Sequence, residues 1–214
     1  MGAPAPIVVA RDVTRTYASG TRALAPVSLA IGAGEFVTLL GPSGCGKTTL
    51  LHLIAGLDAP TSGALAWWGA PAPPRDGDAH RIGYVFQAPT LMPWARVRAN
   101  VRLPLDLAHA PRGEADAAVD AALARVGLDG FADAYPRELS GGMRMRASIA
   151  RALVTRPDLV LLDEPFGALD EFSRHRMDDE LCAWWRDAGL TIAFVTHSIA
   201  EAVYLSTRIL VMAA

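Results

Sequence analysis

The sequence has few of the features that are typical of disulfide-bonded secreted proteins, membrane-spanning proteins or nucleic-acid-binding proteins. It contains only two cysteines, Cys45 and Cys182, which form no metal-ligand pattern and indicate reduced thiols rather than a disulfide framework. It contains no apolar run close to the ~20 residues that cross a bilayer. Its net charge is only −2, which is a poor footprint for binding nucleic acid through phosphate neutralisation. We therefore expect no secreted disulfide scaffold, no membrane-spanning segment and no nucleic-acid partner.

The amino terminus and the overall composition point to one globular domain. The first residues, MGAPAPIVVARDV, have no basic flank and no long apolar core, so they predict no targeting signal. Hydrophobic residues make up 51% of the chain, which is ample for a large core. A length of 214 residues suits a single domain, which we assign to residues 1–214.

Strand and helix patterns alternate along most of the chain. Residues 7–31 are mostly strand-like, and short apolar runs at residues 36–40 and 159–162 predict buried strands. Residues 88–138 differ, because loops and helical periodicity replace the alternation there. We predict an α/β fold with a parallel core sheet, an antiparallel β part at the amino terminus and a helical subdomain inserted at about residues 88–138. The core is expected from residues 1–87 and 139–214.

A glycine-rich loop follows the predicted strand at residues 36–40 and precedes a predicted helix. Its sequence, GPSGCGKT at residues 41–48, matches the spacing of a phosphate-binding P-loop. Glycines let successive backbone N–H groups point inward, and the helix amino terminus adds partial positive charge. Lys47 would reach the β- and γ-phosphates of a nucleotide, and the Thr48 hydroxyl would hold Mg²⁺. The residues expected to bind nucleotide here are Gly41, Pro42, Ser43, Gly44, Cys45, Gly46, Lys47, Thr48 and Thr49.

Two carboxylates follow the apolar run at residues 159–162. Acidic residues after a strand can be ordinary caps, but the phosphate loop elsewhere in the chain favours a site. At the carboxyl end of a parallel strand, Asp163 would face the Mg²⁺ of that loop. Glu164 would be placed to polarise an attacking water molecule.

A second glycine pair lies about a hundred residues after the first loop. Ser140 is a suitable helix cap, and Gly141 and Gly142 allow close backbone approach to an anion. The chain thus has two helix termini suited to phosphate but one lysine-bearing loop. A head-to-tail dimer, in which two chains enclose one γ-phosphate, would use both.

Other side chains predict no site of their own. Trp67, Trp68, Trp184 and Trp185 are expected in core or half-exposed packing, and Arg144, Arg146 and Arg151 on a solvated helix face. Ser198 followed by Glu201 predicts a capping box at a helix start. The remaining histidines are expected at the surface or satisfied, without metal spacing: His52, His80, His109 and His175.

Taken together, these motifs resemble the ATP-binding subunits of ABC (ATP-binding cassette) transporters, and they occur in that family's order. LSGG at residues 139–142 is similar to the signature that contacts ATP in the partner subunit. DEPFGALD at residues 163–170 is similar to the Walker B motif and the D-loop, which implies Asp170 at the dimer interface. The resemblance also implies that Gln87 contacts the γ-phosphate and metal, that His197 contacts the γ-phosphate and that Tyr17 stacks on adenine. The implied fold is that of a P-loop NTPase.

The resemblance implies an importer ATPase at the cytoplasmic face of the bacterial inner membrane. Its implied cofactors are ATP and Mg²⁺, and its implied partners are a transmembrane permease, a second ATPase subunit and, indirectly, a periplasmic substrate-binding protein. Met143 follows the signature where Gln is usual, and this variant resembles the one in importers of nitrate, sulfonates, taurine and pyrimidine precursors. Ala214 comes early compared with the family, so the resemblance leaves open whether the natural chain has a carboxyl-terminal extension. The alternatives are a soluble ABC-type ATPase acting on nucleic acid or ribosomes, an exporter subunit, and a P-loop kinase or GTPase that would leave LSGG and His197 without a task.

Overall fold

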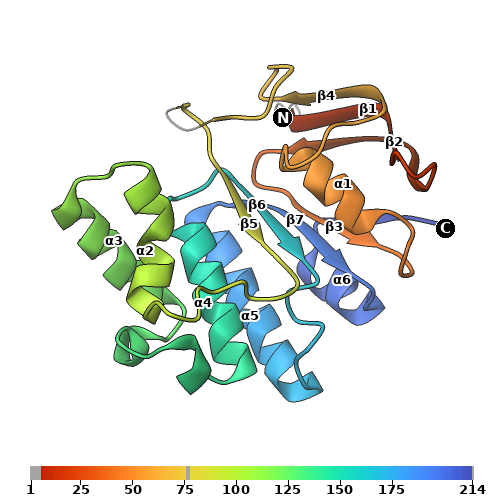
Figure 1. Ribbon diagram of the computed structural model, residues 1–214. Coiled ribbons are helices and arrows are strands. Elements are labelled where there is room, and N and C mark those ends of the chain that lie inside the picture. The colour runs from red at the N-terminus through yellow and green to blue at the C-terminus, as the bar shows by residue number, and fades with distance from the viewer. Residues whose placement is uncertain (1–5, 76–77, 214) are drawn as a thin grey trace.

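The protein contains two sheets, one antiparallel and one parallel (Figure 1). The computed structural model describes residues 6–75 and 78–213; residues 1–5, within the segment where we expect no targeting signal, lie outside them. The antiparallel sheet has the order β2-β1-β4, from β1 (Pro6–Thr16), β2 (Arg22–Gly32) and β4 (Ser62–Trp67). The parallel sheet has the order β5-β6-β7-β3-β8, from β5 (Ile82–Val85), β6 (Leu159–Asp163), β7 (Thr191–Thr196), β3 (Phe36–Leu40) and β8 (Arg208–Val211). The predicted α/β fold with an antiparallel amino-terminal part is confirmed.

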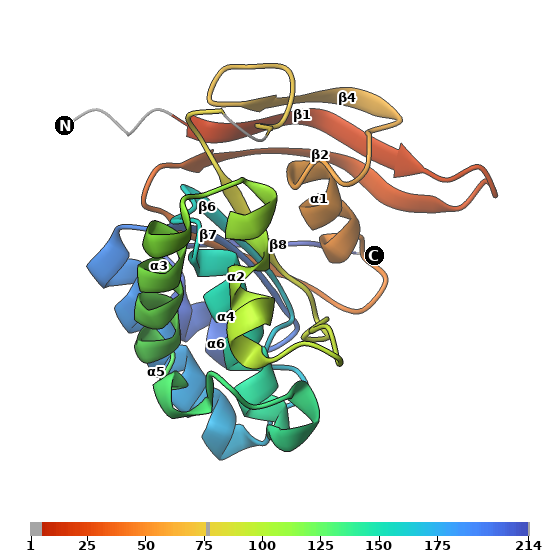
Figure 2. The same ribbon diagram turned by 60° about the vertical axis from the view of Figure 1, so that its left-hand side comes forward.

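The helices lie on both faces of the parallel sheet. Helix α1 (Lys47–Ile54) is sandwiched between the two sheets, whereas α4 (Gly141–Leu153) and α5 (Glu171–Ala188) cover the opposite face (Figures 1 and 2). The remaining helical segments are α2 (Val97–Leu107), α3 (Arg112–Arg125), η1 (Asp129–Phe131), η2 (Pro136–Glu138) and α6 (Ile199–Leu205). Within the described part of the chain, no helix combines the length and apolarity needed to cross a membrane.

The side chains of each strand alternate between the two faces of the parallel sheet, and this explains why both faces are covered. In β6, Leu159 and Leu161 contribute to the core shared with α1 and the antiparallel sheet, whereas Val160 and Leu162 contribute to the core under α4 and α5. Successive side chains of a strand point to opposite faces, so an unbroken apolar run is what a sheet covered on both faces requires.

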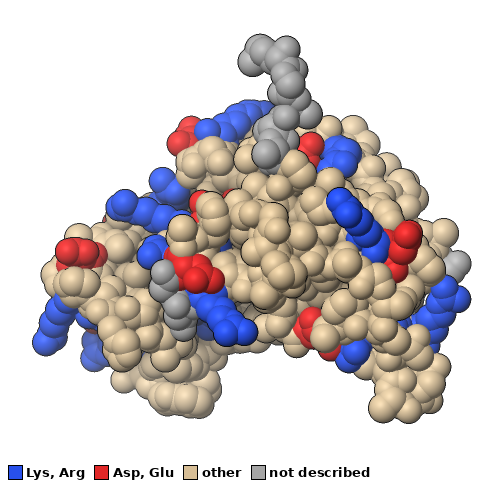
Figure 3. All heavy atoms as spheres, turned by 90° about the horizontal axis from the view of Figure 1, so that it is seen from above, with Lys and Arg blue, Asp and Glu red and all other residues tan. Residues whose placement is uncertain are grey.

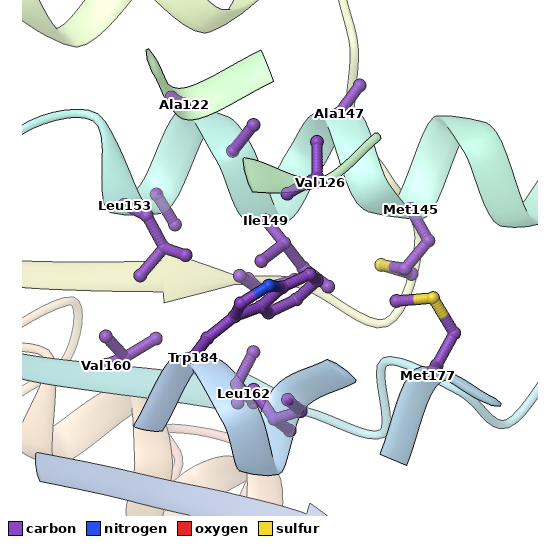
Figure 4. Close-up of a cluster of buried hydrophobic side chains, with 14 of the residues drawn as sticks. Ala122, Val126, Met145, Ala147, Ile149, Leu153, Val160, Leu162, Met177 and Trp184 are labelled. Carbon is purple, nitrogen blue, oxygen red and sulfur yellow. The ribbon is translucent and has the colours of Figure 1, made fainter. Parts of the chain in front are cut away.

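The core beneath α4 and α5 is filled by Trp184. Figure 4 shows its indole between Ile149 of α4 and Leu162 of β6, with Val126 beyond the end of α3. Trp184 is 6% exposed, and its ring N–H donates to the Arg125 carbonyl at 3.2 Å. The predicted core packing of this tryptophan is therefore correct, and its one polar atom is satisfied.

The secondary-structure elements within residues 88–138 are the helices α2 and α3 and the 3₁₀ turns η1 and η2. Val101 of α2 and Val119 of α3 share one hydrophobic core with Val160 of the sheet. A separate helical subdomain with these boundaries stays a prediction.

Two local predictions differ from the structure, the first of them only in part. Ser198 does cap α6, since its hydroxyl accepts from the Glu201 N–H at 3.3 Å. The Glu201 carboxylate does not return to the cap, however, because it accepts from the buried Thr196 hydroxyl instead. The predicted capping box is therefore only half formed.

The predicted solvated arginine face of α4 is the second error. Arg146 pairs with Glu180 of α5 at 2.8 Å and donates to the Val126 carbonyl. Arg151 donates to the carbonyls of Pro89 and Thr90, in the loop after β5. Both guanidinium groups join elements far apart in the sequence, which helical periodicity does not reveal.

Candidate active site

The candidate site lies where parallel strands end. Leu40 of β3 is level with Thr196 of β7, and Val195 of β7 is level with Asp163 of β6. The loops that follow these strands therefore leave the same edge of the sheet. This is where ligands bind in parallel α/β folds.

The loop after β3 has a backbone that requires glycine at several positions. Gly44 and Gly46 have φ of 83° and 97°, in the left-handed region that other residues rarely adopt. A Cβ on Gly46 would lie 2.6 Å from the Ala23 carbonyl oxygen, and one on Gly41 would lie 2.4 Å from that of Met212. The loop leads directly into α1, so its N–H groups and the helix dipole act at one place. This geometry suits an anion such as phosphate.

Lys47 is the only lysine in the sequence, and it is 5% exposed at the start of α1. Its ammonium donates to the carbonyls of Gly41 at 2.7 Å and Pro42 at 2.9 Å. It also lies 3.9 Å from a carboxylate oxygen of Glu164. These contacts hold the Lys47 ammonium against the loop and away from bulk solvent.

Thr48 and Asp163 bring together two oxygen-bearing side chains whose chemistry suits a hard cation. The Thr48 hydroxyl donates to Asp163 at 2.9 Å, and Asp163 is 5% exposed. Burial raises the pKa of the Asp163 carboxyl, although the hydrogen bond from Thr48 acts in the opposite direction. A desolvated carboxylate beside a hydroxyl oxygen favours a hard cation, so these residues fit Mg²⁺.

Glu164 lies between a lysine and a histidine. One carboxylate oxygen is 3.9 Å from the Lys47 ammonium, and the other is 3.4 Å from Nδ1 of His197. Its φ is +43°, and its N–H donates to the Val195 carbonyl of the neighbouring strand at 3.0 Å. A non-glycine residue in this region costs on the order of 1–3 kcal/mol and often marks a functional position.

The signature glycines lie elsewhere in the chain. Ser140 caps α4 by accepting from the Met143 N–H at 3.3 Å, as predicted, and it lines a hollow with Leu169 and Ser173 at the start of α5. The Asp170 carboxylate caps α5 by accepting from the Ser173 N–H at 2.9 Å, and this hydrogen bond lowers the pKa of the carboxyl. Among the described residues, no hydrogen bond or ion pair joins residues 140–142 to residues 41–49.

Gln87 and Tyr17 are accessible from solvent. Gln87 is exposed in the loop after β5, where Arg151 anchors the next residues. Tyr17 is 40% exposed after β1, and the Arg15 guanidinium lies 4.8 Å from its ring centroid. One face of this ring is therefore already occupied by a cation.

Sequence reasoning missed the polar residues behind this site. Thr196, Glu201 and Arg174 form contacts between β7, α6 and α5. The sequence marks Glu201 only as half of a capping box, and no local motif marks Thr196 or Arg174; the ion pair of Arg174 joins residues distant in the sequence. A buried charge on an otherwise amphipathic helix would have been the only signal.

A glycine-rich loop at the carboxyl end of a parallel strand, with an adjoining lysine, threonine and buried aspartate, defines a P-loop nucleotide-binding protein. The family model described as ABC transporter matches residues 24–167. The chain belongs to the ABC transporter family, as an ATP-binding subunit with ATPase activity.

Individual relatives support this assignment. The taurine import ATP-binding protein TauB of Yersinia pestis is 47% identical over 193 residues, which cover 90% of this chain and 74% of that protein. The spermidine/putrescine import ATP-binding protein PotA of Pseudomonas aeruginosa is 46% identical over 207 residues, covering 97% of this chain and 57% of PotA. A dimeric post-hydrolysis structure of the ATP-binding cassette MJ0796, bound to ADP and Pi, is 35% identical with a TM-score of 0.84, covering 96% of this chain and 94% of that one.

Proposed function

We propose that this chain hydrolyses ATP to drive an importer at the cytoplasmic face of the bacterial inner membrane. The import functions named for TauB and PotA support the direction of transport. A taurine-, sulfonate- or nitrate-like cargo is the narrower part of the proposal, supported by TauB and by Met143 after the signature glycines. Basic and acidic side chains are interspersed on the face above the antiparallel sheet (Figure 3), which supports a protein partner over nucleic acid.

The position of Glu164 carries the hydrolytic part of the proposal. Glu164 accepts a proton from the attacking water, while Lys47 neutralises charge on the β- and γ-phosphates. His197, 3.4 Å from Glu164, orients that carboxylate and contacts the γ-phosphate. Residues 41–49, Gly41 to Thr49, hold the phosphates through backbone N–H groups.

Mg²⁺, when bound, would neutralise developing charge on the phosphate oxygens. Thr48 and Asp163 would hold it, and the Gln87 side chain would complete the contacts from the loop after β5. The 2.9 Å hydrogen bond between Thr48 and Asp163 supports this assignment, since both oxygens already point toward one another.

A second copy of the chain completes each site. Residues 140–142 lie apart from residues 41–49, so Ser140, Gly141 and Gly142 act on the nucleotide of the partner copy, with Asp170 at the interface. A Cβ on Gly141 would meet nothing within 4 Å, so this chain alone does not require glycine there. Close approach of a phosphate from outside the chain explains the residue. Tyr17 stacks on the adenine, using the ring face opposite Arg15.

The subunit docks on a transmembrane permease, and a periplasmic substrate-binding protein delivers the cargo to that permease. ATP-driven closure of the two subunits changes the permease conformation, and hydrolysis resets it.

Glu164→Gln tests the hydrolytic role. The variant keeps the shape of the side chain but loses the base, so we expect ATP binding, an accumulated dimer and turnover at least about 100-fold slower. Size-exclusion chromatography with light scattering measures the dimer, and phosphate release measures turnover. Glu171→Gln, a carboxylate on the first turn of α5, is the control and should hydrolyse normally. Normal turnover in Glu164→Gln would contradict the role.

The transporter role is tested separately. Tagged protein is captured from detergent-solubilised native membranes, and its partners are identified by mass spectrometry. A multi-span permease is the expected partner, and only ribosomal or nucleoid proteins would contradict the proposal.

A further inference from the structure

A buried polar cluster lies directly behind His197. Thr196 at the end of β7 is 3% exposed, Glu201 of α6 is 6% exposed and Asp178 of α5 is 2% exposed. Charged groups are rarely buried to this degree unless they are paired, because desolvation is costly. The proposed hydrolysis uses none of these three side chains.

The cluster holds the residues on both sides of His197. The Thr196 hydroxyl donates to the Glu201 carboxylate and also accepts from the Ser198 N–H at 3.0 Å. Ser198 in turn accepts from the Glu201 N–H at 3.3 Å. The backbone before and after His197 is therefore tied to Glu201.

Arg174 connects Glu201 to the turn that precedes α5. Its Nε lies 3.6 Å from the other carboxylate oxygen of Glu201, and its Nη2 donates to the Leu169 carbonyl at 3.0 Å. Leu169 immediately precedes Asp170, the cap of α5. One guanidinium thus joins the turn at Asp170 to the helix that holds the turn at His197.

We propose that Arg174 and Glu201 are positioning residues, which hold the His197 imidazole at Glu164 and link its turn to the turn at Asp170. The inference rests on the proposed function, because it assumes that His197 acts in hydrolysis. A purely structural link between α5 and α6 is the alternative. That alternative predicts a loss of stability without a specific effect on His197.

The first test combines Arg174→Met with His197→Ala. Methionine keeps most of the apolar stem but removes the two contacts of the guanidinium. We expect kcat to fall about tenfold with the KM for ATP within about twofold, as for the loss of an ion pair that positions a second residue. If Arg174 acts through His197, Arg174→Met causes no further loss in the His197→Ala background.

Arg176→Met is the matched control on the same helix. Its guanidinium is largely exposed and pairs with Glu180 at 3.3 Å, away from His197. This variant should keep wild-type kcat. Urea unfolding of each variant shows that the assayed protein is folded.

The second test observes His197 directly. The sequence has five histidines, so their ring signals can be assigned in spectra of histidine-labelled protein. We expect Arg174→Met and Glu201→Gln to shift the ring signals of His197, whereas Arg176→Met leaves them unchanged.

The outcomes separate this inference from the proposed function. An equal loss of kcat with and without His197, or unshifted His197 signals in Arg174→Met, would overturn the inference alone. Full activity in His197→Ala would remove His197 from the mechanism, and the positioning role with it.

Discussion

Asp178 makes the stability of the fold depend on pH in a direction opposite to that of most carboxylates. Burial raises the pKa of this carboxyl from 3.8 to about 7, and the nearby negative charge of Glu201 adds to the effect. The other charged groups facing it are Arg174, which lowers the pKa, and Asp179; His175 lies 3.9 Å away. Between about pH 4 and pH 7 the folded chain keeps a proton that the unfolded chain has lost. Stability from this group therefore falls as pH rises through that window.

The size of the effect follows from the two pKa values. A pKa difference of about three pH units corresponds to about 4 kcal/mol, at roughly 1.4 kcal/mol per unit. Relaxation and water penetration around a buried carboxylate reduce such differences, so we expect about 2 kcal/mol. Asp178→Asn removes the ionisation while keeping the shape. The variant should match the wild type near pH 4.5 and exceed its free energy of unfolding by about 2 kcal/mol at pH 8.

Urea unfolding of both proteins across this pH range, with a reducing agent for the two cysteines, measures the difference. Asp179→Asn is the control, because Asp179 is exposed and accepts from the Tyr204 hydroxyl. Because the charge of Asp179 also raises the pKa of Asp178, as the smallest of its causes, Asp179→Asn should change the pH profile in this window by much less than Asp178→Asn does. Parallel profiles for Asp178→Asn and the wild type would refute the reasoning.

Two further predictions concern nucleotide affinity and the core. Tyr17→Ala should weaken ATP binding by about 1–2 kcal/mol, or roughly five- to thirtyfold, measured by fluorescent-nucleotide titration; unchanged affinity would remove Tyr17 from the site. Trp184→Ala should lower the free energy of unfolding by about 3–5 kcal/mol, because the cavity beneath α4 and α5 cannot collapse fully. Trp185→Ala, whose ring is partly exposed and donates to Gly34, is the comparison and should cost less; equal losses would contradict the packing account.

The elements that sequence predicts well are those whose signal is local. The apolar run at residues 36–40 coincides with β3, and the P-loop match places Lys47 at the start of α1. The sequence predicts Thr48 and Asp163 at one Mg²⁺ site, and the structure brings them together: Thr48 in the first turn of α1 donates to Asp163, the last residue of β6.

The features that the sequence did not predict depend on tertiary contacts. Arg146 and Arg151 look like solvated residues by helical spacing, but their partners lie on α5 and in the loop after β5. Glu201 fits a capping box locally, yet its carboxylate accepts from the buried Thr196 hydroxyl, and the Ser198 N–H of the cap donates to that same hydroxyl. In both cases tertiary packing outweighs a local preference.

The central claim, that two chains complete each ATP site, is tested most directly by mixing two inactive variants. Lys47→Ala lacks the phosphate-binding lysine, and Ser140→Arg blocks the signature; Ser140→Ala controls for the lost cap of α4. In a head-to-tail dimer, a mixed pair contains one site in which both Lys47 and Ser140 are intact. With random pairing and independent sites, ATP hydrolysis should recover to about a quarter of the wild-type rate. No recovery, with both variants shown to be folded and Ser140→Arg still binding ATP, would contradict the account.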